Sequence, residues 1–105
     1  MIQEEIQELL AAPPSGDDAP SLDHIEHTLT AGYASALALE AERWRLERKI
    51  ADVAAHLARG ADTDEASELA SLGQRLAAAD GNLSQLRALL SSLRTRAAEV
   101  RASAA

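Results

Sequence analysis

Apolar side chains recur along two stretches of this chain at spacings that alternate between three and four residues. The first seam consists of Leu22, Ile25, Leu29, Gly32, Ala36, Leu39, Arg43, Leu46, Ile50, Val53 and Leu57, where Gly32 and Arg43 are the exceptions. The second seam consists of Leu69, Leu72, Leu76, Ala79, Leu83, Leu86, Leu90, Leu93, Ala97 and Val100. Such spacing lines up one stripe of side chains along a helix, as in helices that pack side by side. The sequence therefore predicts two long α-helices, over about 21–59 and 63–102.

Residues that favour helix ends bound the two stretches. Ser21 is a favourable N-cap before the first stretch, and Gly60 is a favourable C-cap after it. Asp62, with Glu65 three residues later, has the spacing of a capping box that starts the second helix. Because so few residues separate the two helices, we expect residues 21–105 to form an antiparallel, coiled-coil-like hairpin.

The strongest turn signal in the second stretch is Asp80-Gly81-Asn82. The seam nevertheless keeps its phase from Ala79 to Leu83, which a true turn would have no reason to preserve. Gly81 would then lie on the outer face of a continuous helix, where it costs about 1 kcal/mol relative to Ala. We expect one helix to run through this point. The alternative is that Asn82 caps a third helix.

The N-terminal segment has a different pattern. Ile2, Ile6 and Leu9 share one face of a predicted short amphipathic helix within residues 1–12. A Pro-Pro pair ends that helix, and a linker rich in Pro, Ser, Gly and Asp follows over residues 13–20. The spacing of the three apolar residues is typical of a helix that docks in a hydrophobic groove. The groove can belong to its own hairpin or to a partner.

Composition supports an all-α fold and excludes several functions. Helix-favouring Ala, Leu, Glu, Arg and Gln are abundant, whereas Phe is absent and Tyr33 and Trp44 are the only aromatic residues among 105. The net charge of −7 argues against non-specific binding of nucleic acid, which requires a basic surface. The absence of cysteine excludes disulfides and a thiol nucleophile.

The same features favour a cytoplasmic protein without a membrane segment. No apolar stretch approaches the length of a transmembrane helix. The first residues, MIQEEIQELL, lack the positive charge that begins a signal peptide. Arg outnumbers Lys nine to one, which is typical of a GC-rich bacterial genome.

The two seams also match each other across the predicted hairpin. When positions are paired outward from the loop, Gly32 faces Leu90 and Arg43 faces Ala79, so small residues meet larger ones. Charge agrees with this pairing, because the first 42 residues carry nine acidic and no basic side chains, whereas residues 81–105 carry four Arg and one Glu. Opposite charges then attract in the antiparallel arrangement.

A second apolar face on the first long helix has no cover in a two-helix hairpin. Its largest members are Tyr33, Leu37 and Trp44. We expect a homodimer that buries this face in a four-helix bundle. If the chain is a monomer, the same three residues are the predicted docking site for another protein, because large exposed apolar patches commonly mark interaction sites.

The segment DHIEH, residues 23–27, is the only stretch that resembles a metal site. Asp23 and His27 are four residues apart, and His24 and His27 are three apart, so either pair can share a metal on a helix. Because Ile25 is the seam residue here, both histidines face outward. We therefore interpret the segment as a solvated first helical turn and expect no metal or other cofactor.

Nothing in the sequence indicates an enzyme. It contains no arrangement of nucleophile, base and acid, no phosphate-binding glycine loop and no inward pair of carboxylates. Arg43 in the seam is interpreted as a residue that fixes helix register and can reach Asp80. We predict a non-catalytic helical interaction or assembly module of the bacterial cytosol. Two alternatives are a metal-binding, ferritin-like helical bundle and an acidic chaperone or inhibitor of a basic partner.

Overall fold

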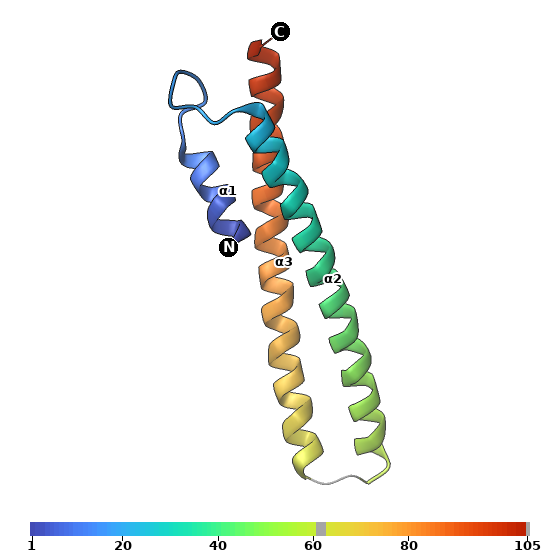
Figure 1. The fold of residues 1–105 in the computed structure, drawn as a ribbon. Helices are drawn as coiled ribbons and strands as arrows, with labels where there is room; N and C mark the ends of the chain where they lie inside the picture. Colours follow the sequence, from blue (N-terminus) through green and yellow to red (C-terminus); the bar gives the residue numbers. More distant parts are fainter. Residues whose placement is uncertain (61–62, 105) are drawn as a thin grey trace. The chain divides into compact units, whose positions relative to one another are not determined.

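The computed structural model of the chain describes residues 1–60 and 63–104, and these residues form three α-helices (Figure 1). The helices are α1 (Ile2–Ala11), α2 (Leu22–Ala58) and α3 (Thr63–Ala104). No β-strand occurs within the described residues. The prediction of an all-α protein with one short and two long helices is confirmed.

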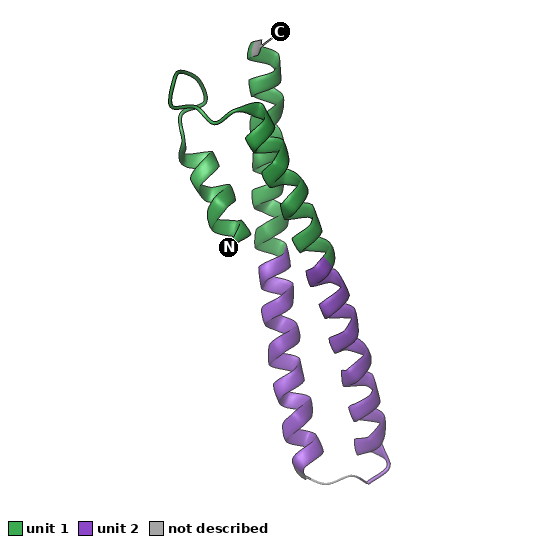
Figure 2. Cartoon of the chain, in the orientation of Figure 1, with its two compact units in different colours: residues 1–37, 84–105 green, residues 38–83 purple. Residues whose placement is uncertain are grey.

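The chain divides into two compact units (Figure 2). Unit 1 comprises residues 1–37 and 84–105, so it contains α1 with the first part of α2 and the last part of α3. Unit 2 comprises residues 38–83, the remaining parts of α2 and α3. Each unit holds its two segments of α2 and α3 as an antiparallel, hairpin-like pair.

The ends of α2 follow from local capping. The backbone N–H of His24 donates to Ser21 Oγ at 3.1 Å, which satisfies one of the amides left free at a helix start. At the other end, Gly60 has a φ of 95° and its N–H donates to the Leu57 carbonyl at 3.1 Å. Only glycine adopts that conformation without steric cost. Asp62, and with it the predicted capping box, lies outside the described residues.

Helix α3 continues without a break through Asp80-Gly81-Asn82. Gly81 is exposed, and no atom lies within 4 Å of the place where a Cβ would stand. The predicted continuous helix is therefore confirmed, and the alternative of a third long helix beginning at Asn82 is wrong. The regular spacing of the seam therefore predicts the structure better here than the local turn signal does. The packing of the leucines on both sides keeps the backbone helical through these residues.

Unit 1 is a three-helix arrangement around one apolar core. Helix α1 lies against both α2 and α3 and brings two buried side chains to the core, Ile6 and Leu9. The other buried apolar side chains are Ile25, Leu29, Ala36, Leu86, Leu90, Leu93 and Ala97. The hydroxyl of Thr28, the buried polar side chain of this unit, donates to the His24 carbonyl at 2.9 Å.

At Gly32, side chains from both other helices of unit 1 lie close to the backbone of α2. A Cβ at this position would overlap the Leu90 side chain and would stand 3.5 Å from Ile6 Cδ1. The predicted pairing of Gly32 with Leu90 is therefore confirmed. The apparent gap in the first seam is the site where helices from two other parts of the chain approach α2.

Unit 2 is a two-helix arrangement with a smaller core. Leu46, Leu72 and Ala79 form a buried cluster, and Ile50, Val53 and Leu76 pack against it while partly exposed. Beside the cluster, Arg43 Nη1 donates to Asp80 Oδ1 at 3.3 Å, which confirms the predicted reach of this arginine. Lys49 Nζ lies 3.8 Å from Glu68 Oε1. Both ion pairs agree with the antiparallel register.

Candidate protein-docking surfaces

The apolar face of α1 is used within unit 1. Ile6 is fully buried and Leu9 is 7% exposed, whereas Ile2, one turn earlier, is only partly buried. The three residues share one face, as their spacing requires. They lie in a groove between the unit 1 segments of α2 and α3, so the helix expected to bind a groove has one on its own chain.

Arg96 of α3 holds the C-terminal end of α1. Its Nη1 donates to the Ala12 carbonyl and its Nη2 to the Leu10 carbonyl, both at 3.2 Å. Leu10 lies in the last turn of α1 and Ala12 is its C-cap residue, and that turn has no basic residue of its own. A cation at this end also complements the negative pole of the helix dipole. Glu99, 3.8 Å from Arg96 Nε, helps to orient the guanidinium.

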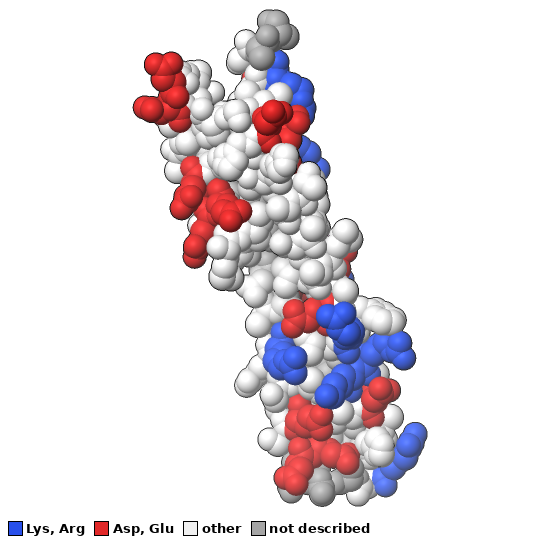
Figure 3. Space-filling model, in the orientation of Figure 1, with Lys and Arg blue, Asp and Glu red and all other residues white. Residues whose placement is uncertain are grey.

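The outward face of α1 is acidic. Glu4, Glu5 and Glu8 are exposed, and Figure 3 shows acidic side chains gathered over this helix. The first turn of α1 therefore carries two carboxylates at the positive pole of the dipole, and both stabilise a short helix. Because these side chains face away from the groove, they do not contribute to its apolar contacts.

Tyr33 and Leu37 are the exposed large hydrophobic residues of α2 in unit 1. Tyr33 is 41% exposed and Leu37 is 66% exposed. The Tyr33 hydroxyl accepts a hydrogen bond from Arg94 Nη1 at 3.4 Å, so its polar end is anchored to α3. Leu37 is the more accessible of the two.

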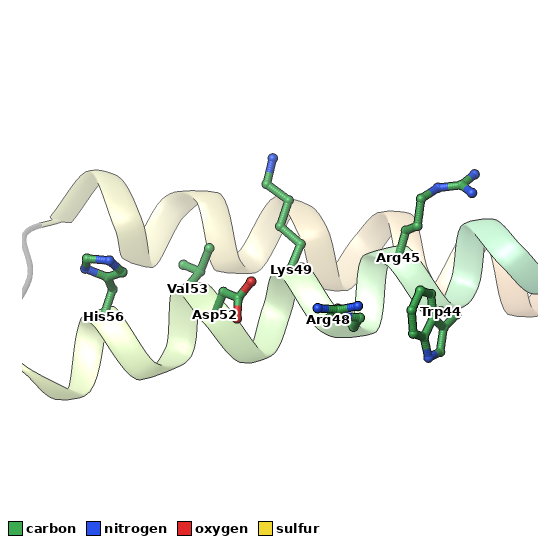
Figure 4. A pocket seen from close by; sticks show the side chains of 7 residues that line it. All are labelled: Trp44, Arg45, Arg48, Lys49, Asp52, Val53 and His56. Atoms are coloured by element: carbon green, nitrogen blue, oxygen red, sulfur yellow. The ribbon is translucent and has the colours of Figure 1, made fainter.

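Trp44 is the exposed large hydrophobic residue of unit 2, at 57% exposure. The guanidinium of Arg48 stacks 4.8 Å from the centre of the indole ring, a cation–π contact between residues one turn apart. A shallow hollow beside them is lined by Trp44, Arg45, Arg48, Lys49, Asp52, Val53 and His56. All seven side chains project from α2 (Figure 4), so the hollow is a helix surface rather than a cavity between elements.

The structure separates the candidate metal residues. Asp23 and His27 line one shallow hollow of unit 1 together with Glu26, whereas His24 does not take part in it. Glu26 is engaged by Arg101 Nη2 at 2.6 Å. Among the described residues, no group of three or more His, Asp or Glu side chains comes together in a way that could hold a metal ion.

Two residues of unit 1 have roles that the sequence pattern did not reveal. The seam pattern shows Gly32 as a gap opposite Leu90 but does not indicate its closeness to Ile6. By charge alone, Arg96 is one of four arginines that balance the acidic N-terminal half. A signal in the sequence is its position, because Arg96 directly precedes the seam residue Ala97 and therefore lies at the edge of the buried stripe.

No protein-family model matches the chain, and no curated protein and no solved structure shows significant similarity to it. In the part of the chain that the structure describes, no helix is both long and apolar enough to cross a membrane. The function is therefore inferred from the chain's own surfaces.

Proposed function

We propose that this protein is a non-catalytic helical assembly module of the bacterial cytosol, and that it forms a homodimer through the α2 surface of unit 2. The observation that carries the proposal is Trp44, a large aromatic side chain that is 57% exposed on a two-helix unit. Aromatic residues with accessible faces commonly anchor protein interfaces. The absence of cysteine from the chain agrees with a reducing compartment.

The packing of unit 2 supports self-association. Its buried cluster is small, and three further apolar residues, Ile50, Val53 and Leu76, pack against it but remain partly exposed. Two such units pressed together would form a four-helix bundle, which removes apolar surface of both copies from water. Ala51 and Ala54 are exposed small residues on α2, and such residues let a partner helix approach closely.

Charge on the same surface fits a second copy of unit 2. The hollow beside Trp44 carries Arg45, Arg48 and Lys49 against Asp52. The start of α3 in the same unit carries exposed Asp64 and Glu68. A second copy packed against the first can therefore place its acidic α3 start near this basic part of α2, and electrostatic complementarity would then fix the orientation of the pair.

The proposal is tested by absolute mass from light scattering after gel filtration, with native protein and the Trp44→Ala variant. We expect the native chain to have the mass of a dimer. Trp44→Ala should weaken the dimer by a factor of about 30, the effect of losing a ~2 kcal/mol hot spot. Gln74→Ala, an exposed polar position of unit 2, is the matched control and should leave the dimer intact. A native monomer, or a dimer insensitive to Trp44→Ala, would contradict the proposal.

A further inference from the structure

Helix α1 occupies its groove through a small set of contacts. Ile6 and Leu9 are its buried side chains, and Ile6 Cδ1 lies close to Gly32. Two hydrogen bonds from Arg96 hold the carbonyls of Leu10 and Ala12. Each contact uses a different feature of the groove: the apolar side chains that surround Ile6 and Leu9, the missing side chain at Gly32, and the guanidinium of Arg96. Together these features select the helix that binds and the position of its C-terminal end.

The helix depends on the groove for its structure. It has ten residues, fewer than an isolated helix needs to be stable in water. Its formation and its docking are therefore coupled, and a detached α1 would be an unfolded peptide. The groove in turn receives Ile6 of α1 beside Gly32 and Leu90.

The residues that connect α1 to α2 make few contacts with the rest of unit 1. Residues 13–18 of this connection are all exposed. Within it, the Ala19 N–H donates to the Gly16 carbonyl at 3.2 Å. Ala12, the residue after the helix, has an extended backbone with φ −72° and ψ 157°, and Pro13 and Pro14 follow it.

We propose that the unit 1 groove is an exchange site, which accepts α1 from a second copy of this protein in place of its own. The α1 helix of a second copy has the same sequence, so it would make the same contacts with Gly32, Leu90 and Arg96. Exchange of an identical element between protomers replaces each contact of α1 within the chain by the same contact between chains, and it is therefore a low-cost route to a dimer. The two exchanged helices then tie two copies together.

This inference does not depend on the docking surface of unit 2. The groove, its occupant and the connecting segment all belong to unit 1. The test is therefore made in the Trp44→Ala background, at protein concentrations where the weakened association through unit 2 leaves each variant monomeric. A signal in that background reports exchange of α1 alone, and its loss leaves the homodimer proposed for unit 2 unaffected.

The test mixes two full-length variants, neither of which can bind its own α1 in its own groove. The donor variant, Arg96→Glu, keeps α1 intact but sets a carboxylate against the carbonyls of Leu10 and Ala12. The acceptor variant, Ile6→Asp with Leu9→Asp, keeps the groove but cannot bury its own α1. If helices exchange, the donor's α1 enters the acceptor's groove, and the mixture forms a dimer that neither variant forms alone.

Fluorescence energy transfer locates the exchanged helix. The chain has no cysteine, so a single introduced cysteine is a unique labelling site. Glu8→Cys places one dye on the exposed face of α1 in the donor. Ala88→Cys places the other dye on α3 of the acceptor, beside the hollow that Gln3 and Gln7 of α1 line. We expect energy transfer and a doubled mass in the mixture, and loss of both when the donor also carries Ile6→Asp and Leu9→Asp.

Two further measurements keep the outcome decisive. If α1 of the Arg96→Glu variant stays in its own groove, Gly32→Leu replaces Arg96→Glu as the donor variant. The added leucine side chain would enter the space that Leu90 and Ile6 occupy. A synthetic peptide of residues 1–12 should bind the acceptor and compete with the donor. Absence of energy transfer with both donors, or failure of this peptide to bind a folded acceptor, would overturn the inference. Equal binding by an unrelated amphipathic peptide would show a general helix receptor and would overturn the assignment to a second copy.

Discussion

Units 1 and 2 are built from the same two helices but differ in how well their apolar side chains are covered. In unit 1, Ile25 and Leu93 are at most 1% exposed, and α1 adds the buried side chains of Ile6 and Leu9 to the core. In unit 2, Leu46 and Leu72 are buried between two helices, but Ile50 and Leu76, in the same kind of seam, stay partly exposed. A seam therefore determines which residues face a neighbouring helix, and a third helix adds further buried side chains to the core.

The difference also separates two kinds of surface. Unit 1 has its groove filled by α1, and the contacts that fill it are specific in position, from Gly32 at one point to Arg96 at another. Unit 2 has an open α2 surface with Trp44 and a basic hollow. The groove of unit 1 therefore selects a particular helix, whereas the α2 surface of unit 2 offers accessible apolar and charged side chains to a partner.

The largest expected contrast is between leucines in the two cores. Leu93→Ala in unit 1 should lower the free energy of unfolding by about 3 kcal/mol, since a fully buried leucine leaves a cavity. Leu76→Ala in unit 2 should cost only about 1–2 kcal/mol, because the side chain already touches water. Urea titration followed by circular dichroism measures both values. Equal losses would mean that the two leucines are buried to the same extent, which would contradict the difference between the units.

Replacing a glycine by alanine should change the stability of the two units in opposite directions. Gly32→Ala should destabilise the protein by about 1–2 kcal/mol, because the added Cβ overlaps Leu90, which is only 3% exposed and cannot swing into solvent. Gly73→Ala in unit 2 should stabilise it by about 0.5–1 kcal/mol, since open space surrounds that position in the helix. The same urea titration decides the signs. A stabilising Gly32→Ala would show that Leu90 and Ile6 can move aside.

The arginines that link helices should differ by a smaller amount. Arg96→Ala should cost about 1.5 kcal/mol, because a partly buried cation loses two hydrogen bonds to the end of α1. Arg43→Ala should cost at most about 1 kcal/mol, since its partner Asp80 is half exposed and water replaces the contact. Hydrogen exchange of the α1 amides is the more specific readout. It should accelerate in Arg96→Ala and stay unchanged in Arg43→Ala.

The smallest expected effect concerns the ion pair at the open end of unit 1. Glu26→Gln should remove the contact with Arg101 and cost up to about 1 kcal/mol in low salt, because both side chains are about half exposed. The loss should shrink in high salt, where exposed charges are screened. Melting temperatures of native protein and variant at two salt concentrations measure this. A loss that persists in high salt would indicate that Glu26 acts through packing.

Much of the fold could be predicted from the pattern of the chain. The two seams, with Ser21 and Gly60 at the ends of the first helix, were sufficient to place α2 and α3 and their antiparallel pairing. The seam also gave the correct result at Asp80-Gly81-Asn82, where composition alone favours a turn. Local composition fails there because the leucines on both sides pack against a neighbouring helix whatever the identity of the exposed residues between them.

The docking of α1 could not be predicted in the same way. Ile2, Ile6 and Leu9 required a groove, but their spacing fits a groove on the same chain as well as one on a partner. The residues that complete the groove lie far from α1 in the sequence, and neither Gly32 nor Arg96 is hydrophobic. A pattern of apolar positions therefore does not detect them, although one supplies space and the other supplies hydrogen bonds.

The pattern of residues along the chain is sufficient to predict that this protein is all-α, that two long helices pair in antiparallel fashion, and which side chains face the seam. These properties follow from spacing, capping and turn length, which are local along the chain. Three features become visible only in the folded chain: α1 packs in unit 1, Gly32 lies beside side chains of two other helices, and Arg96 binds the end of α1. Those contacts join residues that are distant in sequence, and they depend on the shape of a groove that exists only after α2 and α3 have come together.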